Sequence, residues 1–520
     1  MKARSVTVVL GATLLALGCG ACGTILGIEA LDAGPGPDAT AQDGMTADTT
    51  PLDSPGEETA LRDSSAPDGT TSDGTPNDTG ADGGDSSPMD SSSTDSPVTD
   101  SSTGGDAGPG DASFDSATLD GVPIASVGGG FFPLGNASQV HVIYAQNDQR
   151  VWVFYLADDS YSILTMTSSD LKTWTAGDPV VLSEPTSGFG NNFSLAYANL
   201  GNTDVVHLVV SEALPGDGGF FGETVHLRMA ITGPAGAGHL GNPTMTSFIV
   251  NGEGNDIDGP ATVVTSTGVV VDATGRDNDE PTQGDMDIWQ SSLPDEGGTS
   301  WSSVFTQKGY YPVSGETSAH QLIALSEGGV VGAWADDGNE SYSRVSWQQS
   351  FSGLWNADPT SPGSIFAILD GGASVTVDYN SWSLCRLTDT EIHAMAHVSV
   401  GSGAPTSFAH AIFDGTTWQT APAPGDLTGD AFNGMVLVSD VDPTDGMLAV
   451  ATSNNTSQLN VAKWIPGSPG SWTAWRTFTS TDPSFKWIAG SGCGNLRPSV
   501  FWVDTATQMF VGADVSGFLH

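Results

Sequence analysis

Carboxylates gather in one part of the chain. The stretch reads Asp272-Ala273-Thr274-Gly275-Arg276-Asp277-Asn278-Asp279-Glu280 and continues to Asp285 and Asp287. Closely set carboxylates offer the hard oxygen ligands that Ca²⁺ prefers, and a carboxyl with a raised pKa can act as a general acid. We take Asp258, Asp277 and Asp279 as candidate catalytic residues, and Asp277, Asp279 and Asp285 as candidate metal ligands. The alternative is a solvated acidic loop.

Cationic and aromatic side chains form a second group of candidates. Arginines that face a channel can hold a carboxylate ligand through paired hydrogen bonds, and aromatic rings can stack on the apolar faces of sugars. The predicted ligand-binding residues are Arg276, Arg386, Arg497, Tyr379, Trp382 and Trp487. Arg386 and Arg497 are expected near the starts of innermost strands. The alternatives are arginines paired with neighbouring carboxylates and rings packed in a core.

Histidine and cysteine give weaker signals. His393 and His397 share one strand face, but four residues along a strand separate them by about 13 Å, too far to chelate one metal. Cys385 and Cys493 are the two cysteines beyond residue 22. Export would favour a disulfide between them, whereas they fall in repeat units that are not neighbours, so their pairing stays open.

A repeated unit positions all these residues. Short runs rich in β-forming residues recur from Gly121 onward, and turn-terminal tryptophans fall at Trp174, Trp301, Trp355, Trp418 and Trp472, at intervals of 127, 54, 63 and 54 residues. A period of this length with four strands per unit is typical of propeller blades. The sequence predicts an all-β fold, a six- or seven-bladed β-propeller with seven preferred.

The last unit lacks strands, and an open blade would leave exposed edges. We therefore expect Val122–Phe132 to supply a strand to it. The first repeat contains Ser168-Ser169-Asp170-Leu171-Lys172-Thr173-Trp174. This turn resembles the Asp-box of sialidase-like propellers, in which Asp and Ser bond local amides and the Trp packs between strands. It also looks like glycoside hydrolases with five-bladed propellers. The stretch Phe131-Phe132-Pro133 lacks the arginine of the first sialidase motif.

The first residues of the chain resemble an export signal. Lys2 and Arg4 precede the apolar run Val6–Leu17, which has the length of a signal peptide core. The following Leu-Gly-Cys resembles a bacterial lipoprotein signal with Cys19 as the lipidated residue; Cys22 and ordinary secretion are the alternatives. By the same resemblance, Gly20 implies the outer membrane. We assign residues 1–18 to the signal peptide, 19–120 to a lipidated, disordered tether and 121–520 to the propeller.

The tether and the net charge limit the partners. Acids recur every five residues from Asp38 to Asp78, which keeps a chain extended. With 61 acidic and 14 basic residues the chain lacks the cationic footprint of nucleic-acid binding.

The sequence therefore predicts a monomeric, surface-anchored lipoprotein whose propeller binds glycans or other extracellular polymers without catalysis. An exo-acting glycoside hydrolase and a protein-docking role remain alternatives, as does a periplasmic or secreted location. No cofactor is expected, with Ca²⁺ as an option.

Overall fold

We analysed a computed structural model of the chain. It describes residues 114, 117–126, 140–157, 161–184, 193–213, 222–250, 257–277, 284–291, 300–311, 320–336, 344–351, 354–355, 376–399, 407–415, 417–427, 432–453, 458–467, 469–479, 485–504 and 507–520. The chain divides into two units, Met1–Val98 and Thr99–His520, and every described residue belongs to the second.

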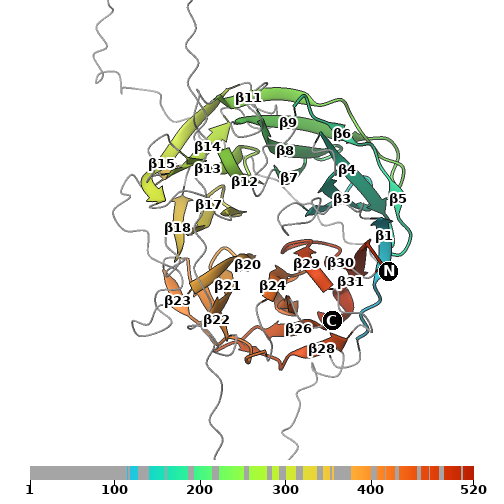
Figure 1. Cartoon of the computed structure of the whole chain (residues 1–520), viewed down its shortest axis with the longest axis vertical. Coiled ribbons are helices and arrows are strands. Elements are labelled where there is room, and N and C mark those ends of the chain that lie inside the picture. Colours follow the sequence, from blue (N-terminus) through green and yellow to red (C-terminus); the bar gives the residue numbers. More distant parts are fainter. Residues whose placement is uncertain are drawn as a thin grey trace, which may run out of the picture. The chain divides into compact units, whose positions relative to one another are not determined.

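The described strands form seven antiparallel sheets, which we call blades 1 to 7 (Figure 1). Blade 1 holds β2 (Val140–Ala145), β3 (Arg150–Leu156), β4 (Ser162–Ser168), β5 (Thr175–Ala176) and β6 (Val180–Val181). Blade 2 holds β7 (Phe193–Asn199), β8 (Asp204–Ala213), β9 (Gly222–Thr232), β10 (His239–Leu240) and β11 (Thr244–Val250). Blade 3 holds β12 (Ile257–Val264), β13 (Val270–Asp277), β14 (Gly284–Ser291) and β15 (Trp301–Tyr311).

The other four blades continue in chain order. Blade 4 holds β16 (His320–Ala324), β17 (Val330–Asp336), β18 (Arg344–Phe351) and β19 (Leu354–Trp355). Blade 5 holds β20 (Thr376–Thr388), β21 (Glu391–Ser399), β22 (Ser407–Phe413) and β23 (Trp418–Thr420). Blade 6 holds β24 (Phe432–Val438), β25 (Met447–Ser453), β26 (Gln458–Ile465), β27 (Ser471–Trp472) and β28 (Arg476–Thr479). Blade 7 holds β29 (Phe485–Gly490), β30 (Ser499–Asp504), β31 (Met509–Asp514) and β1 (Val122–Ser126).

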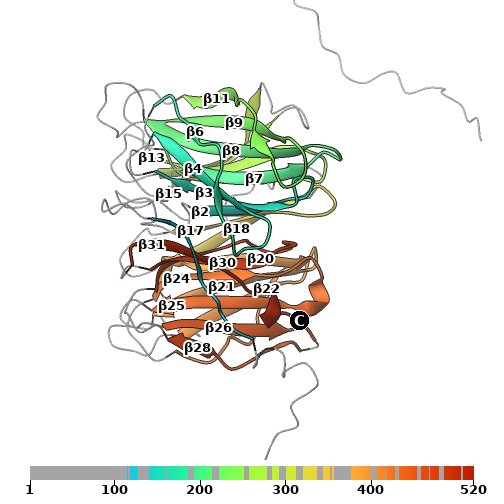
Figure 2. The ribbon, with the colours of Figure 1, turned by 90° about the vertical axis from the view of Figure 1, so that its right-hand side faces the viewer.

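The innermost strand of each blade contacts that of the next. The contacts run through β2, β7, β12, β16, β20, β24 and β29 and return to β2. Seen from the side, the strands run between the two faces of this ring (Figure 2). The all-β propeller is confirmed, and its seven sheets agree with the preferred blade number. Two short 3-10 turns, η2 (Pro443–Asp445) and η3 (Ser516–Phe518), complete the described elements.

The N-terminal strand closes the ring as predicted. Strand β1 pairs with β31, with Val122 opposite Gly512 and Ser126 opposite Met509. This pairing covers an edge of β31 that would otherwise be open. Folding also reaches further back than residue 121, because Phe114 is buried against Phe518 with ring centroids 5.8 Å apart.

Both faces of a blade are buried, which explains the apolar runs. In β3, Val151 and Val153 face the cluster shared with blade 7, whereas Trp152 and Phe154 face the cluster shared with blade 2. Successive strand residues point to opposite faces. A blade between two others therefore needs apolar residues at both sets of positions.

The first Trp turn forms the predicted local hydrogen bonds. The carboxylate of Asp170 accepts from the Lys172 and Thr173 amides at 2.8 and 2.7 Å. These bonds lower the pKa of Asp170, the Thr173 amide most. The ring of Trp174 then packs edge-on against Phe501 of blade 7. The turn thus joins the first blade to the last.

A disulfide joins Cys385 on β20 to Cys493, with their Cα atoms 5.4 Å apart. Cys493 lies in the segment 491–498 that follows β29. In this segment the Gly494 amide donates to the Ser439 hydroxyl just after β24, at 3.0 Å. The segment therefore crosses the end of blade 6 and links blades 5 and 7 without spanning the centre of the ring.

The described part of the chain contains no helix with the length and hydrophobicity of a membrane span.

Candidate functional site

Blade 3 brings together the backbone positions of the predicted acidic site. Asp258 lies opposite Gly275, Asp277 lies opposite Gly284, and Asp285 lies opposite Arg276. All belong to the edge where the innermost strand begins and the second strand ends. Asp279, and the side chains of the residues just named, lie outside the described part, so their roles as catalytic residues or Ca²⁺ ligands stay predictions.

The acidic stretch is not the single loop that the sequence suggested. Residues 270–277 form β13 and residues 284–291 form β14, paired along their length. Asp272 has no exposed surface and accepts hydrogen bonds from the hydroxyls of Thr262 at 2.8 Å and Thr274 at 2.5 Å. Burial raises the pKa of Asp272 to about 7, against the effect of both hydroxyls. Both oxygens of this carboxyl are bonded to hydroxyls inside the blade, so Asp272 is a packing element.

Glu212 is a buried acid that the sequence reasoning missed. It lies near the end of β8, on the same edge as the start of β12, and is 1% exposed. The Ser183 hydroxyl donates to its Oε2 at 2.7 Å, and its Oε1 has no hydrogen-bond partner within the described residues. Burial raises the pKa of Glu212, and the nearby Glu223 adds to the rise, against hydrogen bonds from Ser183 and Glu184. A glutamate that ends an apolar strand (VVHLVVSE) was the available signal.

Arg386 does not lie where the sequence placed it. Strand β20 begins at Thr376, so Arg386 is near its end and not at its start. Its guanidinium donates to the Ala324 carbonyl of blade 4 and pairs with Asp389 at 3.3 Å. These contacts favour the alternative of an arginine paired with a neighbouring carboxylate of its own blade, with a hydrogen bond that crosses to blade 4. Arg497 is exposed and lies two residues before β30, which is the second strand of blade 7 and not its innermost strand.

The predicted aromatic platform is only partly described. Trp382 is 3% exposed and packs with Leu384, Ile392 and other residues of blades 4 and 5. Its ring is therefore a core element, and stacking on a glycan is not supported for this residue. Tyr379 and Trp487 belong to β20 and β29, but their side chains lie outside the described part, as does that of Arg276.

Buried histidine pairs occupy equivalent places in two blades. His207 and His226 stack at 5.3 Å with an 8° tilt, and His393 and His410 stack at 5.1 Å with an 11° tilt. His207 lies opposite Arg228, which is two residues after His226. In the same way, His393 lies opposite Ile412, which is two residues after His410. The ring nitrogens approach to 3.1 and 2.9 Å. His393 thus pairs with His410, on the neighbouring strand of its blade.

Aromatic rings fill the same register positions in blade 7, where Phe501 and Phe510 stack at 5.8 Å. Trp301 lies edge-on to His226 as Trp174 does to Phe501. Burial is the main cause that lowers the pKa of His207 to about 3, of His226 to about 4 and of His410 to about 3. The imidazoles therefore act as neutral, flat packing groups between blades.

A pocket of about 430 Å³ opens beside β1. Its lining residues are Leu119, Gly121, Pro123, Phe478, Thr479, Trp502, Asp504, Thr507, Met509 and Val511. Among these residues Thr479 and Thr507 are exposed, and Trp502 is buried. Pockets of this size, with apolar walls and a few polar groups, commonly hold small molecules. The sequence did not predict it, because its walls come from three separate parts of the chain.

No family model and no curated protein matches this chain. Similar solved structures include a protein of unknown function from Dyadobacter fermentans, at 16% identity and a TM-score of 0.37, covering 70% of this chain and 99% of that one. A leech intramolecular trans-sialidase has 8% identity and a TM-score of 0.37, covering 73% and 91%. Aleuria aurantia lectin has 12% identity and a TM-score of 0.35, covering 62% and 91%. Likenesses this distant do not assign an activity.

Proposed function

We propose that this chain is an exported propeller that binds glycans without altering them, through the pocket beside β1. The pocket supports this because the partly exposed ring of Phe478 lines it together with the carboxylate of Asp504 and two exposed threonine hydroxyls, whereas Trp502 is a buried wall residue. A sugar offers apolar C–H faces to such rings and hydroxyls to such acceptors and donors. The volume of about 430 Å³ suits a ligand of one or two sugar rings.

Export is supported by the disulfide. A Cys385–Cys493 bond persists in oxidising compartments and is rare in a reducing cytosol. With the signal-like N-terminus, we place the protein on the outer membrane or cell surface through a lipid on Cys19. A Cys19→Ser chain is expected to lose its lipid label and leave the membrane fraction. Retention of the label on this variant would shift the assignment to Cys22.

A binding experiment tests the pocket. The full chain is screened by native mass spectrometry against a mixed glycan library. Two variants are screened beside it: Thr507→Trp, which adds a large ring at an exposed lining residue, and Asp504→Asn, which removes a carboxylate. Asp178→Asn serves as the matched control, because Asp178 is a partly exposed acid of blade 1. Intact glycan should bind the wild-type and control chains, and both pocket variants should bind at least tenfold more weakly. Equal binding by all four chains would reject this pocket.

A glycoside hydrolase is the second candidate, favoured by Glu212. A buried carboxyl with a raised pKa can stay protonated and act as a general acid. Its edge of the ring also carries Asp258 and Asp277, which extends the predicted catalytic set. Shortened glycans in the same screen, abolished by Glu212→Gln with binding retained, would favour this function over simple binding.

A further inference from the structure

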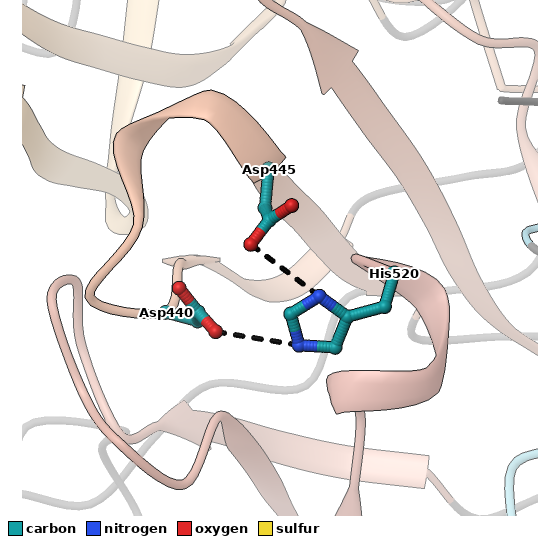
Figure 3. Close-up of side chains that lie close together, drawn as sticks. All are labelled: Asp440, Asp445 and His520. Atoms are coloured by element: carbon teal, nitrogen blue, oxygen red, sulfur yellow. Dashed lines mark ion pairs between the residues drawn. The ribbon is translucent and has the colours of Figure 1, made fainter.

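Three metal-binding side chains meet where blade 6 lies beside the end of blade 7. Asp440 and Asp445 belong to the connection between β24 and β25, and His520 follows η3. The Nε2 atom of His520 lies 3.3 Å from Asp440 Oδ2, and its Nδ1 atom lies 3.3 Å from Asp445 Oδ2 (Figure 3). One ligand atom from each residue can be chosen so that all three lie within 4.8 Å of one another.

The surrounding structure fixes the positions of Asp440 and of the turn that carries His520. The Asp442 amide donates to Asp440 Oδ1 at 2.5 Å, which leaves Oδ2 directed at His520. Phe518 and Leu519 are buried, and the ammonium of Lys463 donates to the Leu519 carbonyl. His520 is thus presented from an anchored turn while its ring stays more than half exposed. The ring can therefore adjust to an ion without unfolding its support.

Negative charge exceeds positive charge around this histidine. Two carboxylates contact one imidazole. A third acid, Asp442, lies in the same turn, where its backbone amide donates to Asp440 and its carboxylate accepts from the Thr444 amide at 2.9 Å. A protonated imidazole balances one of the three acids, and the Lys463 ammonium on the neighbouring Leu519 carbonyl adds one positive charge, so the acids remain in excess. A bound cation would supply the missing positive charge.

The donor set selects the type of cation. Zn²⁺ binds imidazole nitrogen and carboxylate oxygen at about 2.0–2.2 Å, whereas Ca²⁺ and Mg²⁺ prefer oxygen ligands throughout. Tetrahedral ligands at these distances lie about 3.4 Å apart. A given ion binds one imidazole nitrogen, so the measured 3.3 Å separation matches this spacing for one carboxylate only. The other carboxylate, whose ligand atom lies within 4.8 Å, must reach the same ion by rotation of its side chain. From this geometry we propose that Asp440, Asp445 and His520 form a Zn²⁺ site, with water completing the shell.

Such a site would tie blade 6 to the end of blade 7. Ser439, beside Asp440, already contacts the segment that carries the disulfide. The ion would therefore reinforce the same junction as the Cys385–Cys493 bond. This inference does not depend on glycan binding.

Zn²⁺ titration of the metal-free full chain by calorimetry tests the proposal. The variants are Asp445→Asn and His520→Gln. The matched control is His239→Gln, because His239 is an exposed histidine that contacts one carboxylate, Asp178, at 3.1 Å. Wild type and control should each bind one Zn²⁺ at this site, and both site variants should lose at least tenfold in affinity. Ca²⁺ should bind without any difference among the chains.

Two results would overturn the proposal. One is a wild-type chain that takes up no Zn²⁺, which would leave the cluster as ion pairs alone. The other is unchanged Zn²⁺ affinity in His520→Gln and Asp445→Asn, which would place the bound metal elsewhere. Thermal unfolding with and without Zn²⁺ provides a second readout, since a ligand of the folded state raises the melting temperature. That rise should be present in the control and absent in the site variants.

Discussion

Replacing the histidine pair of blade 2 by phenylalanines should make the propeller less sensitive to acid. The double variant His207→Phe/His226→Phe copies the stacked Phe501 and Phe510 of blade 7 at equivalent register positions. The buried histidines are neutral in the folded chain because desolvation lowers their pKa values to about 3 and about 4, and Arg228 opposes their charged forms. In the unfolded chain each regains an ordinary pKa near 6.5.

The direction and size of this change in the free energy of unfolding follow from proton linkage. Below pH 6.5 the unfolded chain binds protons that the folded pair does not, so stability falls as the pH falls toward the folded pKa values. Each histidine lowers the free energy of unfolding by about 1.36 kcal/mol for each pH unit in this range. At pH 5.0 this gives about 2 kcal/mol per histidine, or about 4 kcal/mol for the pair.

Urea unfolding followed by tryptophan fluorescence at pH 7.5 and pH 5.0 measures the effect. Between pH 7.5 and pH 5.0, the free energy of unfolding should fall by about 4 kcal/mol less in the double variant than in wild type. His239→Gln, at an exposed histidine, should lose as much as wild type. If the double variant folds poorly, the ring resonances of His207 and His226 in the wild-type chain provide the measurement, and they should stay neutral at pH 5. Protonation of either ring near pH 6.5 would refute the reasoning.

Three further perturbations probe the joints of the ring. Asp148→Ala should destabilise by about 3–5 kcal/mol in urea unfolding, because the Asp148 carboxylate is buried, pairs with Arg150 at 2.8 Å and accepts the Trp152 indole and Gly238 amide; a loss below about 1 kcal/mol would contradict this role. Cys385→Ser/Cys493→Ser should lower the free energy of unfolding by about 4–5 kcal/mol, as expected for a crosslink between residues 108 positions apart. Equal melting temperatures of the wild-type and variant chains would count against the bond. Gly512→Ala should weaken closure of blade 7, because an added Cβ would lie 2.7 Å from Phe501 and 2.8 Å from Ile124; limited proteolysis should then release the N-terminal strand earlier than in wild type.

The repeat and its closure could be predicted from the sequence because they depend on local patterns. Apolar runs between turn residues locate most strands, and an incomplete last unit implies a partner for β31. The prediction missed β29, the innermost strand of blade 7, because its run FKWIAG is short and follows a polar stretch. Asp272 and Thr274 begin the acidic stretch of the sequence, and their spacing alone does not reveal that they bond one another inside the blade.

The candidate site depends on distant parts of the chain, which no spacing rule joins. The pocket combines residues 119–123 with residues 478–479 and 502–511. Arg386 looked like a ligand contact because charge alone does not reveal its partner, the Ala324 carbonyl of the neighbouring blade. The disulfide was left open because units five and seven are not neighbours, and a crossing segment between β29 and β30 removes that obstacle.

Native mass spectrometry of the full chain against a mixed glycan library, with wild type beside Thr507→Trp, tests glycan binding most directly. We predict that wild type gains the mass of an intact glycan and that Thr507→Trp gains at least tenfold less. Absence of any glycan on the wild-type chain, or equal occupancy of the two chains, would contradict binding at the pocket beside β1.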